Sequence, residues 1–133
     1  MPDGYVTATR RPVPLAEPFA TAECAWFWTM AALTARRDGA RNLAGMASTL
    51  RPCEPDDVVR VLNRLYYQRR IDLMHARILR IWGERGVPPD SHALGEMSDA
   101  RIWDEAMRRL TWPLQAKGIV VSDRKYLLQS DTR

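Results

Sequence analysis

The sequence has few of the residues that build metal sites and disulfide frameworks. Only two of its 133 residues are cysteine and only two are histidine. Zinc ligands recur at a spacing of about two to four residues, and no pair here has that spacing. The four residues are Cys24, Cys53, His75 and His92. We therefore expect no bound metal, and we expect both cysteines to be reduced thiols rather than a disulfide.

Long hydrophobic runs are also missing. The longest, Cys24–Trp28, continues past Thr29 only as far as Leu33, which is far short of the roughly 20 residues that cross a bilayer. The proline-containing N-terminus has no apolar core of the kind that export signals require. These absences predict a cytoplasmic protein with no membrane partner.

Motifs of known catalytic chemistry do not occur along the chain. There is no glycine-rich phosphate loop, no pair of catalytic carboxylates and no nucleophile elbow. The sequence therefore predicts a protein that is not an enzyme and that holds no cofactor. A weaker alternative is an enzyme or metal protein that uses Cys53 or His75, although both residues also suit structural roles.

The chain does contain an ordinary globular balance of residues, with 46% hydrophobic and 27% charged. This balance and length suit one domain with a single core. Residues 1–18 hold four prolines and predict an irregular arm. Residues 19–128 predict a single helical domain, and residues 129–133 a short tail.

Capping residues and apolar spacing predict four helices. The expected buried stripes lie within residues 26–33, 58–66, 74–82 and 102–110. The predicted boundaries are a first helix from the cap Thr21 to Gly39, a second from Pro55 to Arg70, and a third from the cap Asp72 to Gly83 or Gly86. A fourth helix follows the cap Ser98, and Pro113 either kinks or ends it, with Gly118 as its latest stop.

Two short apolar segments follow the fourth helix, Ile119–Val121 and Lys125–Leu128, and together they predict a β-hairpin. The fold class we expect is a mostly α bundle of about four helices with this C-terminal hairpin. The joint before Asp72 is so short that the second and third helices should pack on one another. Such a pair resembles the helix-turn-helix and winged-helix DNA binders at the level of fold only.

The chain is basic, with a net charge of +4 and a pI near 9.5. Most of this excess lies between residues 56 and 85, where seven arginines face four acidic residues. The seven are Arg60, Arg64, Arg69, Arg70, Arg77, Arg80 and Arg85. Because clustered arginines neutralise phosphates, these residues predict a DNA-binding regulatory module.

Two observations leave alternatives open. Arginine makes up 18 of the 20 basic residues, which indicates either phosphate recognition or a GC-rich genome, and surface arginines also commonly serve only to solvate a helical face. The fourth helix balances Arg101, Arg108 and Arg109 against Asp104 and Glu105 at i,i+3 and i,i+4 spacing, so we expect its face to be self-neutralised and a poor candidate for DNA.

The five tryptophans support a second hypothesis. They are Trp26, Trp28, Trp82, Trp103 and Trp112. At helical spacing tryptophans are usually core anchors, but two of them on one exposed patch would indicate a protein interface. The alternative function is therefore a protein-interaction or oligomerisation adaptor, with a partner protein or a homodimer and no nucleic-acid role.

Four segments resemble a family of small alphaproteobacterial proteins with no assigned activity. They are Ala25-Trp26-Phe27-Trp28, Arg37-Asp38-Gly39-Ala40-Arg41, Arg51-Pro52-Cys53-Glu54-Pro55-Asp56-Asp57 and Trp103-Asp104-Glu105-Ala106. The similarity runs from about residue 17 to residue 120. It implies a bacterial cytoplasmic protein and brings no cofactor or catalytic residue.

Overall fold

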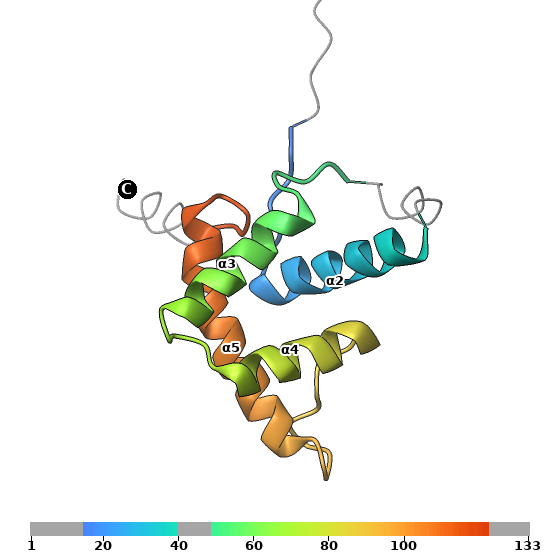
Figure 1. Ribbon diagram of the computed structural model, residues 1–133, viewed down its shortest axis with the longest axis vertical. Helices are drawn as coiled ribbons and strands as arrows, with labels where there is room; N and C mark the ends of the chain where they lie inside the picture. Colours follow the sequence, from blue (N-terminus) through green and yellow to red (C-terminus); the bar gives the residue numbers. More distant parts are fainter. Residues whose placement is uncertain (1–14, 40–48, 123–133) are drawn as a thin grey trace, which may run out of the picture.

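The computed structural model describes residues 15–39 and 49–122. Within these residues the chain forms four helices, α2 (Ala22–Asp38), α3 (Pro55–Tyr67), α4 (Leu73–Arg85) and α5 (Met97–Ala116) (Figure 1). The mostly helical fold with four helices packed together is therefore confirmed. Residues 1–14 of the predicted arm, the predicted segment Lys125–Leu128 and the tail lie outside the described residues.

Helices α2 and α5 each pack against all the other helices, whereas α3 and α4 barely touch each other. Figure 1 shows α3 and α4 on opposite sides of α2. The expected packing of these two helices on one another is therefore wrong. Ile71, in the joint between them, is only 1% exposed, so the joint itself is anchored in the core and directs α4 away from α3.

The joint begins with a left-handed residue that ends α3. The N–H of Arg70 donates to the carbonyl of Leu65 at 2.9 Å, and the N–H of Arg69 donates to Tyr66 at 3.0 Å. These bonds define a Schellman motif, in which the residue after the C-cap usually is glycine. Here that residue is Arg69, with φ 61°, and it is the only non-glycine residue of the described ranges with a positive φ.

Local capping signals set the starts of the first three helices. The Thr21 side chain accepts from the N–H of Cys24 at 3.1 Å, Pro55 is the first residue of α3, and Asp72 accepts from the N–H of His75 at 3.1 Å. Each predicted start is confirmed. Gly86, the predicted stop of α4, is its left-handed C-cap with φ 78°.

The predicted start of α5 is wrong, whereas its end lies within the predicted limits. The helix begins at Met97 instead of after Ser98. Its N-cap Glu96 makes no side-chain capping bond and instead accepts from the N–H of Asp90 at 2.8 Å. Pro113 lies inside α5, which continues to Ala116. A proline lacks one backbone N–H, so it removes one helical hydrogen bond, and in the last turn of α5 the helix continues past it.

The core includes Trp26, Val58, Leu79, Trp103 and Leu110, and each of these side chains is at most 4% exposed. On α4 the expected stripe is confirmed at Ile78 and Trp82, which are buried, and is wrong at Met74, which is 48% exposed. His75 and Leu79 are buried as well, because α4 faces both α2 and α5.

After α5 the chain returns to the start of α2. Val120 forms a parallel β-bridge with Phe19, through N–H donation from Phe19 to Ile119 at 2.8 Å and from Val121 to Phe19 at 2.9 Å. The first segment of the predicted hairpin is thus paired with residues near the N-terminal side of the domain. This bridge is the one β contact in the described ranges.

Candidate nucleic-acid interface

The seven arginines predicted to bind DNA do not form one cluster. Arg60 is paired with Asp57, with Nη1 and Oδ1 2.8 Å apart, and the guanidinium of Arg85 lies 4.4 Å from the ring centroid of Trp82. These two side chains already have partners within the chain. Neither of them lines the groove described next.

Three more of the predicted arginines also lie elsewhere. Arg77 and Arg80 border a shallow hollow on α4 beside Leu73 and Ala76. Arg69 stands at the left-handed position of the joint and does not line the groove either. The structure therefore separates five of the seven predicted arginines from the remaining two.

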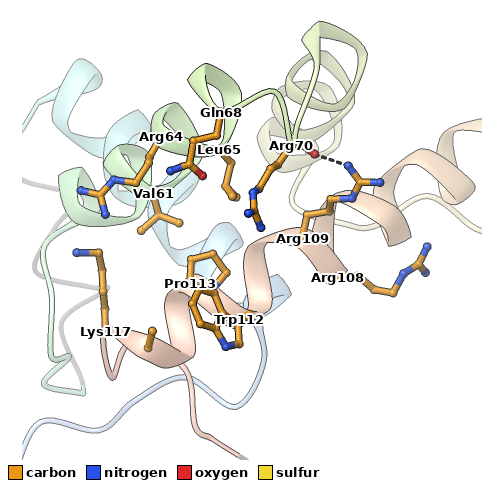
Figure 2. Close-up of a pocket in the computed structure, with 11 residues that line it drawn as sticks. Val61, Arg64, Leu65, Gln68, Arg70, Arg108, Arg109, Trp112, Pro113 and Lys117 are labelled. Atoms are coloured by element: carbon orange, nitrogen blue, oxygen red, sulfur yellow. Dashed lines mark hydrogen bonds between the residues drawn. The ribbon is translucent and has the colours of Figure 1, made fainter.

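The remaining two, Arg64 and Arg70, line a groove of about 620 Å³ between α3 and α5. Figure 2 shows the groove with α3 and the joint on one side and the C-terminal half of α5 on the other. The lining residues are Val61, Arg64, Leu65, Gln68, Arg70, Arg108, Arg109, Trp112, Pro113, Ala116 and Lys117. Five of these are cationic and none is acidic.

Helix α5 and its C-cap supply three of the five cations, Arg108, Arg109 and Lys117. The balance of charge expected on this helix is present in the pair of Arg109 with Glu105, but Arg108 and Lys117 line the groove without an acidic neighbour in its lining. The acidic residues of α5, Asp104 and Glu105, lie one turn earlier, outside the groove. A signal was present in the sequence, because residues 109, 113 and 117 are four apart and therefore share one face of a helix.

Four of the five cations form no ion pair within the part of the chain that the structure describes; these are Arg64, Arg70, Arg108 and Lys117. Arginines elsewhere do have such partners, as Arg36 does in Asp56 at 3.2 Å. Like charges that share a groove repel each other, and a bound anion relieves this repulsion. The groove is thus chemically suited to a polyanion.

Arg109 is the cation held most firmly. Its guanidinium donates to the backbone carbonyl of Arg70 (dashed in Figure 2) and contacts the Glu105 carboxylate at 3.4 Å. Glu105 in turn accepts from His75 Nε2 at 2.6 Å. The His75 hydrogen bond, with the charges of Arg109 and Arg108, holds the pKa of Glu105 below its usual value.

His75 is a packing residue with both ring nitrogens hydrogen-bonded. It is 7% exposed, and its Nδ1 accepts from the N–H of Asp72 at 3.1 Å. The same Nδ1 lies 2.9 Å from the Asp72 carboxylate, and Nε2 lies 2.6 Å from the Glu105 carboxylate. The same imidazole therefore caps α4 and joins it to α5. The hydrogen bond from the His75 N–H also lowers the pKa of Asp72.

The cysteines form no disulfide: both are free thiols. Burial, reinforced by the charges of Asp57 and Glu54, raises the pKa of Cys53 to about 11. Such a thiol is protonated at neutral pH and is a poor nucleophile. Among residues 15–39 and 49–122, no group of three or more metal-ligating side chains comes together.

Two further results bear on the class of protein. Within the described ranges, each helix is too short or too polar to cross a membrane. Comparison of the chain with known protein families, with curated proteins and with solved structures finds no match.

Proposed function

We propose that this protein is a DNA-binding module that holds the phosphodiester backbone in the groove between α3 and α5. The observation that carries the proposal is the set of five cations around one groove without an acidic residue among its lining. Arginine and lysine contacts to phosphates supply most of the affinity of non-specific DNA binding. The apolar floor, Val61, Leu65 and Pro113, suits the sugar carbons of a nucleic acid strand.

The proposal does not depend on a helix-turn-helix. In that motif a recognition helix enters the major groove while its partner helix packs beside it, and here α3 and α4 barely touch. The groove argues for backbone contacts, which position a protein on DNA without reading its sequence. A regulatory role, as predicted from the sequence, requires base contacts in addition.

A salt titration of DNA binding tests the proposal. Each phosphate contact contributes a slope of about −0.9 to log K against log [salt] on duplex DNA and about −0.7 on a single strand. The double variant Arg64→Gln/Arg70→Gln should weaken binding and make the slope shallower by about 1.4 to 1.8.

The matched control is Arg77→Gln/Arg80→Gln. It removes the same charge from the same predicted set, but from the surface of α4, so it lowers the net charge equally. The proposal expects this control to retain the slope of the unchanged protein. Equal losses in both double variants would show that net charge, and not the groove, attracts DNA, and no binding at low salt would refute the proposal.

A second candidate function has an observation in its favour. Four large aromatic or apolar side chains are exposed on either side of the joint. They are Tyr66, Tyr67, Leu73 and Met74, which are 44%, 83%, 70% and 48% exposed. Exposed aromatic and apolar groups that lie close together mark protein interfaces. The candidate is a protein-interaction or oligomerisation adaptor.

Light scattering of the unchanged protein and of Tyr67→Ser/Leu73→Ser tests this adaptor. A concentration-dependent dimer that the double variant abolishes would support it. A monomer at every concentration would contradict self-association through this surface.

A further inference from the structure

Three of the five tryptophans are buried in the core, and Trp28 packs against it partly buried. The indole N–H groups of Trp26, Trp82 and Trp103 donate to Leu79, Asp99 and Glu23 at 2.9, 3.0 and 2.8 Å respectively. Trp28 packs on Phe19 with ring centroids 5.2 Å apart. Buried tryptophans normally have such partners for the indole N–H, so folding explains these three, and packing against Phe19 and the core explains Trp28.

Trp112 is the exception. It is 71% exposed, lines the basic groove, and has no hydrogen bond or ring contact within the described part of the chain. An indole left in water contributes little to stability, because stabilisation follows from the apolar area removed from water. Folding thus gives no reason for a tryptophan at this position.

The surroundings of Trp112 indicate what it contacts. Figure 2 shows Trp112 and Pro113 in the middle of the groove, with Lys117 and Arg64 towards one end and Arg70 and Arg109 towards the other. Proteins that bind single strands stack bases on aromatic rings and hold the phosphates with a row of basic side chains. Trp112, with cations on both sides of it, has this arrangement.

We propose that the groove binds single-stranded nucleic acid, with one base stacked on the indole of Trp112 and the flanking phosphates held by Arg64, Arg70 and Lys117. This inference rests on the proposed function and names its ligand. A duplex keeps its base faces stacked on each other, so it offers Trp112 no face. The groove, at about 620 Å³, lies in the size range of sites for one small ligand, which suits a short piece of strand.

The stacking ring is also well placed by its helix. Leu110 and Leu114, on either side of Trp112 in the sequence, are fully buried and fix the backbone of α5 against the core. Arg108 lies one turn before Trp112 on the same helix and joins it in the groove lining. The base-stacking ring and part of the phosphate track therefore belong to one rigid element.

The test compares the unchanged protein, Trp112→Ala and Trp112→Phe by fluorescence anisotropy. The probes are a labelled oligothymidine of about 12 nucleotides, within the site sizes of single-strand binders, its duplex, and an abasic oligonucleotide of the same length. We expect Trp112→Ala to lower affinity for oligothymidine about 5- to 150-fold and Trp112→Phe to retain most of it. Affinity for the abasic strand should not change.

The outcomes separate this inference from the proposed function. If Arg64→Gln/Arg70→Gln weakens binding but Trp112→Ala has no effect on oligothymidine, the backbone groove stands and the stacking inference is wrong. An equal loss on the abasic strand would also overturn it, since no base is present there to stack. If neither variant changes binding, both proposals fail. Because Trp112 is exposed, all variants should keep the far-ultraviolet circular dichroism of the unchanged protein.

Discussion

Gly83, in the middle of α4, is the position where a single methyl group should do most harm. A Cβ built on Gly83 would lie 2.7 Å from Met30 Cγ and 2.7 Å from Trp26 Nε1, both on α2. Carbon atoms without a bond between them normally stay about 3.5 Å apart or more. The glycine therefore permits α2 and α4 to approach each other closely.

Two opposing effects determine the result of Gly83→Ala. Helix propensity alone favours alanine over glycine by about 1 kcal/mol. Overpacking a core costs about 1–3 kcal/mol. The Trp26 indole cannot move away without weakening its 2.9 Å hydrogen bond to the Leu79 carbonyl. Loss of that bond would add a further cost of about 1–3 kcal/mol. We expect a net destabilisation of about 2 kcal/mol.

Thermal unfolding followed by circular dichroism at the helical band measures this effect. For a domain of this size about 2 kcal/mol lowers Tm by about 6–10 °C. The control is Glu84→Ala, one residue further on at an exposed position, which should change stability by less than about 0.5 kcal/mol. A Gly83→Ala protein as stable as the unchanged chain, or more stable, would refute the close approach of α2 and α4.

Four further predictions each concern one residue. Arg69→Gly should stabilise the protein by about 0.5–1 kcal/mol, because glycine adopts φ 61° without the steric cost of a side chain. Gly118, at φ 76°, follows α5 in a second Schellman motif, in which the N–H of Ile119 donates to Leu114 at 2.9 Å and the N–H of Gly118 to Gln115 at 3.0 Å. Gly118→Ala should therefore destabilise the protein, and urea titrations with the opposite signs would contradict both predictions. Cys53, with its pKa raised to about 11, should react with iodoacetamide far more slowly than the exposed Cys24 at about pH 8, and equal rates would contradict its burial. The pKa of Glu105 is lower in the folded protein than in the unfolded chain. Its contribution to stability is therefore present above its ordinary pKa and is lost as the pH falls through the folded value. Glu105→Gln should make stability depend less on pH on the acid side, and an unchanged dependence would exclude the His75 hydrogen bond as the cause.

The starts of α2, α3 and α4 could be predicted because their signals are local. Thr21 and Asp72 each accept from a backbone N–H three residues ahead, and Pro55 needs only its own ring to suit a first helical position. No distant residue takes part in these contacts. The start of α5 could not be predicted in this way, because its N-cap Glu96 makes no side-chain capping bond and accepts instead from the N–H of Asp90, six residues earlier.

Contacts between distant residues were not predictable from one sequence. His75 is explained by Glu105, which is 30 residues away, and Ile71 is buried although it lies in a joint between helices. The burial of His75 and Leu79 beside the expected stripe of α4 likewise follows because α4 faces α2 and α5 together. Periodicity indicates that a helix has an apolar stripe, but it does not indicate which neighbour covers each part of the stripe.

The number of helices, most of their starts and the basic character of the chain could be predicted, because hydrophobic spacing, capping and charge are properties of short stretches. Which cations line one groove depends on how the helices pack. Arg64 and Lys117 are more than fifty residues apart in the sequence and line the same groove only because α3 packs on α5. The same packing leaves Trp112 exposed beside them, while Trp26, Trp82 and Trp103 are buried in the core.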